Sequence, residues 1–281
     1  MNEYVKKSYN TIVNQIINNS KFVRSTKKIE DYNNRELKWK ELVDAIYVLG
    51  PKDGFEHFKQ DAEYQGFLSI VNFLEVKMIQ DLRKTHSEDC KVILDWIEKE
   101  NGDGEYELKE YEFYVFGCHI SHVIISMDMI QNNYKRVLVF ENDSKFYDYF
   151  SNYNIQKLIN FFSKDEENKI GFLNMGFPVT RIDDVTEVTD DEVSLYQDQT
   201  KTTHTYIINQ DTAKKLIKTI DTDIDAPKKL YKDNNIKEYL YRCGADEYFY
   251  NYVKNYCFYI PYTFQQSIGN NRSQDFNYKK K

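Results

Sequence analysis

The chain combines two patterns of apolar residues. Near the N-terminus, apolar residues recur at roughly helical spacing before a charged stretch, which predicts a helical extension over residues 1–40. From residue 42 onward, short apolar runs bounded by turn-forming residues alternate with longer amphipathic segments. The runs predict strands at 45–50, 68–74, 137–140, 169–175, 204–209 and 256–262. The segments predict helices at 54–67, 88–101, 118–134, 211–220 and 245–255.

Strands that alternate with helices indicate an α/β fold with a mostly parallel central sheet covered on both faces. We expect this fold over residues 41–270, between the helical extension and a flexible basic tail at 271–281. The apolar stripe of the extension predicts packing on the main domain or on a second copy, as in a homodimer. Because such sheets bind ligands beyond the carboxyl ends of their strands, polar residues at strand ends are the first site candidates.

Several features of the sequence argue against particular partners, locations and binding motifs. A formal net charge of −7 and a pI near 5.4 argue against a nucleic-acid partner. The chain shows neither a signal-peptide-like apolar core at its start nor a membrane-spanning run, which predicts a cytoplasmic protein. Its four cysteines lack CxxC spacing, so we expect free thiols. GxxxxGK[ST] and GxGxxG loops are absent, so a nucleotide would need another anchor.

The apolar run at 137–140 continues directly into Glu141, Asn142 and Asp143. Burying a carboxylate is costly unless something pairs with it. One interpretation is a solvated turn, since Asn and Asp favour turns. The other is a site where the carboxylates hold Mg²⁺ or Mn²⁺ with a diphosphate. The spacing alone leaves both open.

The segment "FGCHISH", residues 116–122, carries Cys118 and His122 one helical turn apart, with Gly117 at the expected helix entry. A Cys/His nucleophile pair is one interpretation, and a partial zinc site that includes His119 is another. Packing at a strand-to-helix junction remains the default explanation.

A second acidic pair, Asp246 and Glu247, precedes the helix expected at 245–255. Acidic residues in a first helical turn are favoured by the helix dipole, which explains them without any function. A carboxylate that faces a cleft could instead accept a proton from an attacking hydroxyl. The sequence alone does not separate these interpretations.

The run "FGCHISHVIISMDMIQNNYKRVLVFENDSKF" resembles the signature of the family 25 glycosyltransferases, which include lipooligosaccharide and collagen galactosyltransferases. That signature is a Gly-Cys-x-x-Ser-His helix followed by an apolar strand that ends Glu-Asp-Asp. The matching residues are Gly117, Cys118, Ser121, His122, Glu141 and Asp143. In the family's order, "DAIYVLGPKDGFEHF", "THTYIIN" and "GADEYFYNYV" resemble further segments, so the resemblance covers roughly residues 42–270.

The resemblance implies a GT-A type fold and an inverting transfer that depends on Mn²⁺ or Mg²⁺. The donor would be a nucleoside diphosphate sugar, usually UDP-linked, and the acceptor a hydroxyl of a glycan or glycosylated protein. It implies that Glu141 and Asp143 hold the metal and that Asp246, with Glu247 second, acts as the catalytic base. The implied donor-binding residues are Val48, Leu49, Gly50, Gly117, Cys118, Ser121, His122 and Asn142; the implied acceptor-side residues are His204 and Tyr206.

Two departures from the family pattern favour an alternative. Asn142 replaces the usual middle acid, and "VLGPKDG" lacks the Asn-Leu pair and the following Arg. Asn142 can still hydrogen-bond a ribose or a water molecule. The alternative is a catalytically inactive nucleotide-sugar or glycan-binding protein on the same fold. A metal-dependent phosphotransferase is a third interpretation.

Overall fold

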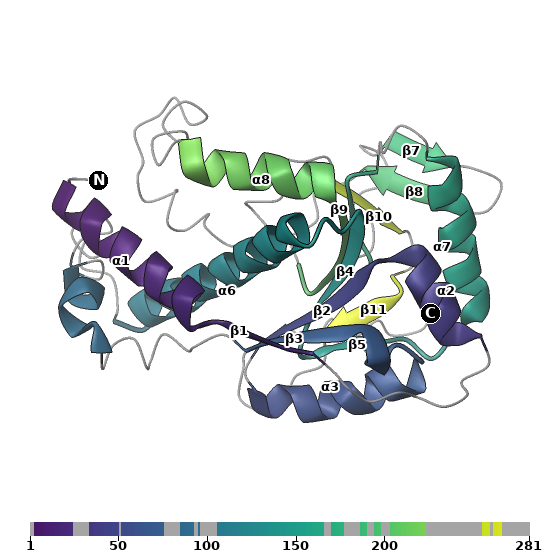
Figure 1. The fold of residues 1–281 in the computed structure, drawn as a ribbon, viewed down its shortest axis with the longest axis horizontal. Coiled ribbons are helices and arrows are strands. Elements are labelled where there is room, and N and C mark those ends of the chain that lie inside the picture. Colours follow the sequence, from purple (N-terminus) through teal and green to yellow (C-terminus); the bar gives the residue numbers. More distant parts are fainter. Residues whose placement is uncertain are drawn as a thin grey trace.

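The structure is a computed structural model that describes residues 3–24, 34–50, 52–75, 85–92, 95, 106–165, 170–176, 186–189, 194–197, 203–222, 255–258 and 261–265. These residues form a nine-stranded sheet with helices packed on both faces, and a separate two-stranded sheet (Figure 1). The α/β class expected from the alternating pattern is confirmed.

The large sheet has the strand order β1-β3-β2-β4-β9-β6-β10-β8-β7. Its strands are β1 (Lys21–Arg24), β3 (Val71–Glu75), β2 (Ala45–Gly50), β4 (Arg136–Glu141), β9 (Thr205–Asn209), β6 (Phe172–Asn174), β10 (Asn255–Phe258), β8 (Ser194–Gln197) and β7 (Thr186–Thr189). The small sheet pairs β5 (Ser144–Phe146) with β11 (Thr263–Gln265) in antiparallel register.

The large sheet is mixed. Strand β2 runs parallel to β3 and β4, and β6 runs parallel to β10, as the alternation of strands and helices predicts. In contrast, β9 runs antiparallel between β4 and β6, and the pairs made by β1, β7 and β8 are also antiparallel. Because β9 is reversed, its amino end meets the carboxyl ends of β4 and β6. The side chains of the candidate site lie at that edge of the sheet.

Two groups of helices cover the sheet (Figure 1). Helices α1 (Glu3–Asn19), α6 (Tyr106–Gln131) and α8 (Gln210–Thr222) contribute to the core on one face. Helices α2 (Arg35–Leu42), α3 (Lys52–Tyr64) and α7 (Asn152–Lys164) contribute to the core on the other. Tyr47 and Val139 pack into the first core, whereas Ile46 and Leu138 pack into the second. Burial on both faces explains the uninterrupted apolar runs of β2 and β4.

The N-terminal extension is more closely joined to the main domain than its sequence suggests. Helix α1 forms as expected, and Ile12 and Ile16 are fully buried in the first core. However, residues 21–24 form the unexpected edge strand β1, which pairs antiparallel with β3. A four-residue strand with a cation at each end has too little local pattern to reveal it. Packing on the domain accounts for Ile12 and Ile16, and self-association through the extension stays a prediction.

Helix α6 begins at Tyr106, well before the expected start at residue 118. Gly117 therefore lies inside the helix and not at its entry, and the expected strand-to-helix junction is wrong. A glycine inside a helix costs roughly 0.5–1 kcal/mol, which is why Gly117 suggested a helix boundary. The rest of a long helix can offset that cost.

The expected strand at 68–74 begins as the 3₁₀ turn η1 (Leu68–Ile70). Of the helix expected at 88–101, residues 88–92 and 95 are described, and all are helical.

Helix α7 was not expected from the sequence. Ser151 caps it in a capping box, with the Ser151 backbone N–H donating to Asn154 Oδ1 over 2.9 Å. Its apolar face is formed by Ile155, Leu158, Ile159 and Phe162, all buried in the second core. The Ser-x-x-Asn sequence before this apolar periodicity was an available signal.

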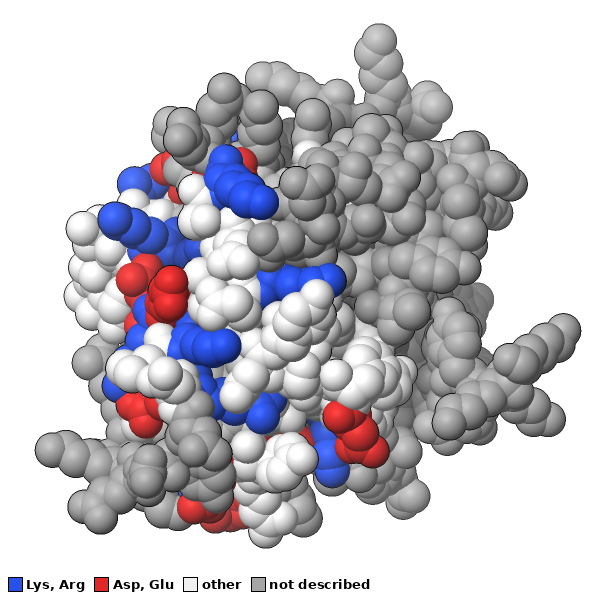
Figure 2. Space-filling view, turned by 90° about the vertical axis from the view of Figure 1, so that its right-hand side faces the viewer, with Lys and Arg blue, Asp and Glu red and all other residues white. Residues whose placement is uncertain are grey.

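Among the helices that the structure describes, none combines the length and apolar character needed to cross a membrane. On the face shown in Figure 2, the Lys and Arg side chains of the described residues lie among acidic and uncharged ones.

Candidate active site

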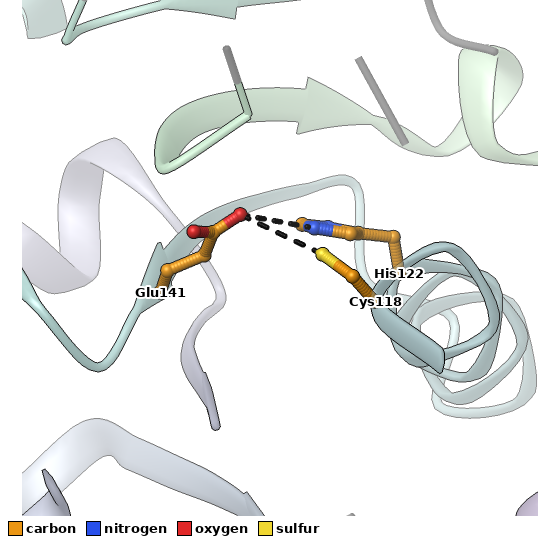
Figure 3. A group of neighbouring side chains, drawn as sticks. All are labelled: Cys118, His122 and Glu141. Atoms are coloured by element: carbon orange, nitrogen blue, oxygen red, sulfur yellow. Dashed lines mark hydrogen bonds and ion pairs between the residues drawn. The ribbon is translucent and has the colours of Figure 1, made fainter. Parts of the chain in front are cut away.

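Three side chains from two elements converge at the carboxyl end of β4. Glu141 is the last residue of that strand, while Cys118 and His122 project from α6 toward it (Figure 3). Glu141 Oε1 lies 3.7 Å from His122 Nε2 and 3.8 Å from Cys118 Sγ. One ligand-type atom from each residue fits within a mutual separation of 4.8 Å. The strand-end acid is therefore held against a thiol and an imidazole.

The local charges favour the ionised form of Glu141, whose side chain is 20% exposed. Burial opposes ionisation, but the nearby His122, assisted by His204 and Thr203, outweighs it and lowers the pKa of Glu141. Thr203 Oγ1 donates to Glu141 Oε1 over 3.4 Å. Glu141 therefore lies at the sheet edge as an ionised carboxylate.

Beneath the carboxylate, Tyr206 fixes the orientation of His122. The phenolic oxygen of Tyr206 lies 2.7 Å from His122 Nδ1, and both side chains are buried. The Tyr206 ring stacks on Phe172 at a centroid distance of 4.7 Å. Burial, with the nearby Cys118 and Glu141, raises the pKa of Tyr206 well above its usual value. Tyr206 therefore remains a neutral phenol that positions His122.

His204 joins the elements around the site through its backbone. Its carbonyl accepts the Glu141 N–H over 2.8 Å and the Ser144 hydroxyl over 2.6 Å. Burial lowers the pKa of the His204 imidazole, although Glu141 and the Thr263 backbone oppose the shift. A Cβ atom on Gly176 would lie 1.8 Å from His204 Nε2, so the absence of a side chain at Gly176 makes room for the ring.

These positions count against the acceptor-side role implied for His204 and Tyr206. An acceptor sugar needs an accessible side chain, whereas His204 is 4% exposed and Tyr206 is fully buried. Both support Glu141 and His122 from inside the protein.

Gly50 and Asn142 meet at the adjacent ends of β2 and β4. The Asn142 N–H donates to the Leu49 carbonyl over 2.8 Å. Gly50 has a φ of +144°, and a Cβ atom there would lie 2.4 Å from Asn142 Cγ. Only glycine accepts this backbone without strain and leaves space for the Asn142 amide. The sequence did not reveal this contact.

The remaining predicted residues differ in their placement. Val48 and Leu49 are buried in the second and first cores, so their side chains do not face a ligand. Ser121 is buried on α6, and Asp143 is half-buried in the turn after β4. Asp143 is outside the group formed by Cys118, His122 and Glu141. Asp246 and Glu247 lie outside the described residues.

Sequence reasoning missed Thr203, Ser144 and Asn174 as parts of this edge. Asn174 ends β6, and its Oδ1 accepts the Gly176 N–H over 2.9 Å. A polar residue that ends a buried strand was an available signal for Asn174. Thr203 and Ser144 carried no such signal, because their place depends on the reversed direction of β9.

The donor atoms around Glu141 determine which cations the site suits. Mg²⁺ and Mn²⁺ prefer sets of oxygen ligands, whereas Cys118 and His122 offer sulfur and nitrogen. Asp143 provides a carboxylate outside that group, next to the Asn142 amide. The oxygen-rich turn 142–143 therefore fits Mn²⁺ or Mg²⁺ better than the side of Glu141 that faces α6.

Residues 105–236 match the family model described as "Glycosyltransferase family 25 (LPS biosynthesis protein)". The match contains β4, β6, β9, α8 and nearly all the side chains that meet at the sheet edge. The protein is a glycosyltransferase. More specifically, residues 105–236 match a family 25 glycosyltransferase domain, as the sequence resemblance predicts. The β2 strand and the Asp246 segment lie outside the matched residues, and no curated protein matches the chain.

Proposed function

We propose that the protein transfers a sugar from a nucleoside diphosphate sugar to a hydroxyl of a glycan or glycosylated protein, and that this donor is a UDP-sugar. The carrying observation is that the family 25 match spans the segment that builds the polar sheet edge around Glu141. We further propose a GT-A type arrangement, inversion at the anomeric carbon and a cytoplasmic location, all of which the family resemblance implies.

The donor would lie over the ends of β2 and β4, where open α/β sheets bind ligands. Gly50 has no side chain, and the Asn142 amide occupies the space that a side chain would fill. The Asn142 amide next to it offers both a donor and an acceptor, which suits a ribose or a diphosphate oxygen. Their contact at the strand ends supports a donor site here.

Asp143 would hold the divalent cation, Mn²⁺ or Mg²⁺, with Glu141 acting directly or through water. When bound, the cation would neutralise the charge that develops on the departing diphosphate. Asp143 is the principal ligand in this proposal because Glu141 already interacts with His122, Cys118 and Thr203.

Asp246, with Glu247 second, would accept the proton from the attacking acceptor hydroxyl. A positioned carboxylate base contributes roughly 10² to 10⁴ in rate. Support for this assignment comes from the family resemblance of the segment "GADEYFYNYV".

The experiment is an assay of nucleotide sugars against a glycan acceptor library, with and without Mn²⁺. We expect release of a free nucleoside diphosphate, and NMR of the product should show an inverted anomeric configuration. Retained configuration would contradict inversion, and undiminished transfer in chelator would contradict metal dependence. Sugar phosphate as a product would indicate a phosphotransferase.

The alternative of a binding protein rests on Asn142, which stands where the family has a middle acid. Thermal shift measures binding separately from turnover, because a ligand stabilises the folded state by mass action. A nucleotide sugar that raises the melting temperature without any diphosphate release, with every acceptor offered, would favour the binding protein.

A further inference from the structure

We propose that Cys118, His122 and Glu141 form a three-ligand site for a transition-metal ion of the Zn²⁺ class. Glu141 is the one side chain that this site has in common with the oxygen-ligand site proposed at Asp143, and its occupancy does not depend on sugar transfer. The three side chains come from α6 and the end of β4, and they point toward a common centre (Figure 3).

The separations of the ligand atoms fit a tetrahedral ion. With Zn–N and Zn–O near 2.0–2.2 Å and Zn–S near 2.3 Å, neighbouring ligands of a tetrahedral Zn²⁺ lie about 3.4 to 3.6 Å apart. Glu141 Oε1 lies 3.7 Å from His122 Nε2 and 3.8 Å from Cys118 Sγ. Small side-chain movements would therefore complete the coordination without a change in the backbone.

The second ring nitrogen of His122 is already held as a metal-binding histidine requires. Ligating histidines use one nitrogen for the metal and bond the other to an outer partner, which fixes the tautomer. His122 Nδ1 lies 2.7 Å from the Tyr206 hydroxyl, while Nε2 faces Glu141. With the proton on Nδ1 donated to Tyr206, Nε2 presents its lone pair to the ion.

The charges balance in the buried site. Binding releases the Cys118 thiol proton to solvent, and the resulting thiolate and the Glu141 carboxylate together neutralise a divalent ion. His122 is only 2% exposed, but Glu141 is 20% exposed, which leaves access for the ion and for water as a fourth ligand.

The ligand set selects among cations. A thiolate, an imidazole and a carboxylate together suit Zn²⁺ and Co²⁺, whereas Mg²⁺ and Mn²⁺ prefer oxygen ligands. Competition between ions therefore distinguishes this site from the cation site proposed at Asp143.

The first test titrates Co²⁺ into metal-stripped protein and follows its absorption. We expect a thiolate-to-cobalt charge-transfer band, strong visible bands of four-coordinate Co²⁺, and their loss on addition of Zn²⁺ but not of Mg²⁺. Cys118→Ser should abolish the charge-transfer band and weaken binding by about 10²-fold or more, since even outer partners contribute about 10- to 100-fold. The matched control Cys90→Ser, which alters a buried cysteine elsewhere, should retain the band.

The second test uses the unaltered protein, so it does not depend on whether a variant folds. Cys118 is half-buried, whereas Cys90 and Cys257 are buried. Zn²⁺ should protect Cys118 from alkylation, as measured by peptide mass spectrometry, and should leave the labelling of Cys90 and Cys257 unchanged.

Three outcomes would overturn the proposal. They are equal alkylation of Cys118 with and without saturating Zn²⁺, a cobalt spectrum without the thiolate band, and a band that survives Cys118→Ser. Asp143→Ala should keep the band even where it abolishes turnover, so failure of the Zn²⁺ site and failure of the proposed sugar transfer give different results.

Discussion

The phenol of Tyr206 lies directly against the imidazole of His122, with 2.7 Å between the hydroxyl oxygen and Nδ1. Tyr206 comes from β9 and His122 from α6, and the contact connects the sheet to the helix beneath Glu141. Because both side chains are buried, water cannot replace either partner at low cost.

Tyr206→Phe should therefore destabilise the protein. The substitution preserves ring packing against Phe172 but leaves Nδ1 of the buried His122 without the phenol. We expect a loss of about 1–3 kcal/mol in the free energy of unfolding, measured by urea denaturation. Tyr153→Phe is the control, because Tyr153 is 67% exposed and its loss should matter little. Equal stability of Tyr206→Phe and wild type would show that the bond contributes nothing.

Gly50→Ala should distort the end of β2. The new Cβ would lie 2.4 Å from Asn142 Cγ, and a φ of +144° strains any residue with a side chain. We expect a loss of about 1–3 kcal/mol in unfolding free energy.

A matched control separates backbone strain from the collision. Gly66 also has a positive φ, of +73°, but the Cβ atom of Gly66→Ala would lie no closer than 3.2 Å to any neighbour, the nearest being Arg35 Cβ. Combining Gly50→Ala with Asn142→Gly should recover part of the loss as a coupling energy in a double-mutant cycle. Strict additivity would contradict the contact between Gly50 and Asn142.

The buried His204 should make stability depend on pH. Its folded-state pKa is lowered, mainly by burial, from the usual 6.5. Below about pH 6.5 the unfolded chain takes up a proton that the folded chain does not. Stability therefore decreases as the pH is lowered, until the folded-state pKa is reached.

His204→Gln should flatten that part of the profile. Melting temperatures of wild type and variant, measured over a pH series from neutral to mildly acidic, give the comparison. The wild-type curve should fall more steeply below about pH 6.5. Parallel curves would show that His204 is not the source of the dependence.

Asp143→Ala tests the proposed cation site. We expect diphosphate release at subsaturating Mn²⁺ to disappear, because the ion loses its principal ligand, while the metal-free melting temperature hardly moves. Asp148→Ala, which alters an exposed acid nearby, should leave both quantities unchanged. Full activity of Asp143→Ala would remove the metal assignment.

Asp246→Asn separates three roles for that residue. If Asp246 is the base, transfer should fall by roughly 10² or more while Mn²⁺-dependent donor affinity changes little. If it is a metal ligand, transfer and donor affinity should weaken together. If it only begins a helix, neither should change, because Asn also serves there.

The sequence revealed those elements whose burial leaves a local pattern. Strands β2, β4 and β9 lie in the middle of the sheet and read as continuous apolar runs, so all three were predicted. Strand β1 was missed because its four residues gain their structure from pairing with β3. The parallel neighbours of β2 follow from alternation, but the reversal of β9 does not, since strand order depends on contacts between distant segments.

The same limit applies to the site. The spacing of Cys118 and His122 on one helical face was visible, and so was the strand-end acid Glu141. Their convergence was not, because it requires α6 to cross the end of β4. Tyr206 was implied to lie on the acceptor side, yet it is buried against His122, a position that follows from the antiparallel pairing of β9.

The position of β10 sets an order of assembly during synthesis. Strand β10 lies between β6 and β8, although it follows both of them along the chain. Until residues 255–258 leave the ribosome, β6 presents an open edge, and the β7–β8 hairpin lacks its attachment to the rest of the large sheet. The earlier strands can pair as they emerge, but this half of the sheet closes late. A nascent chain stalled before Asn255 would therefore expose an edge to which other chains can add.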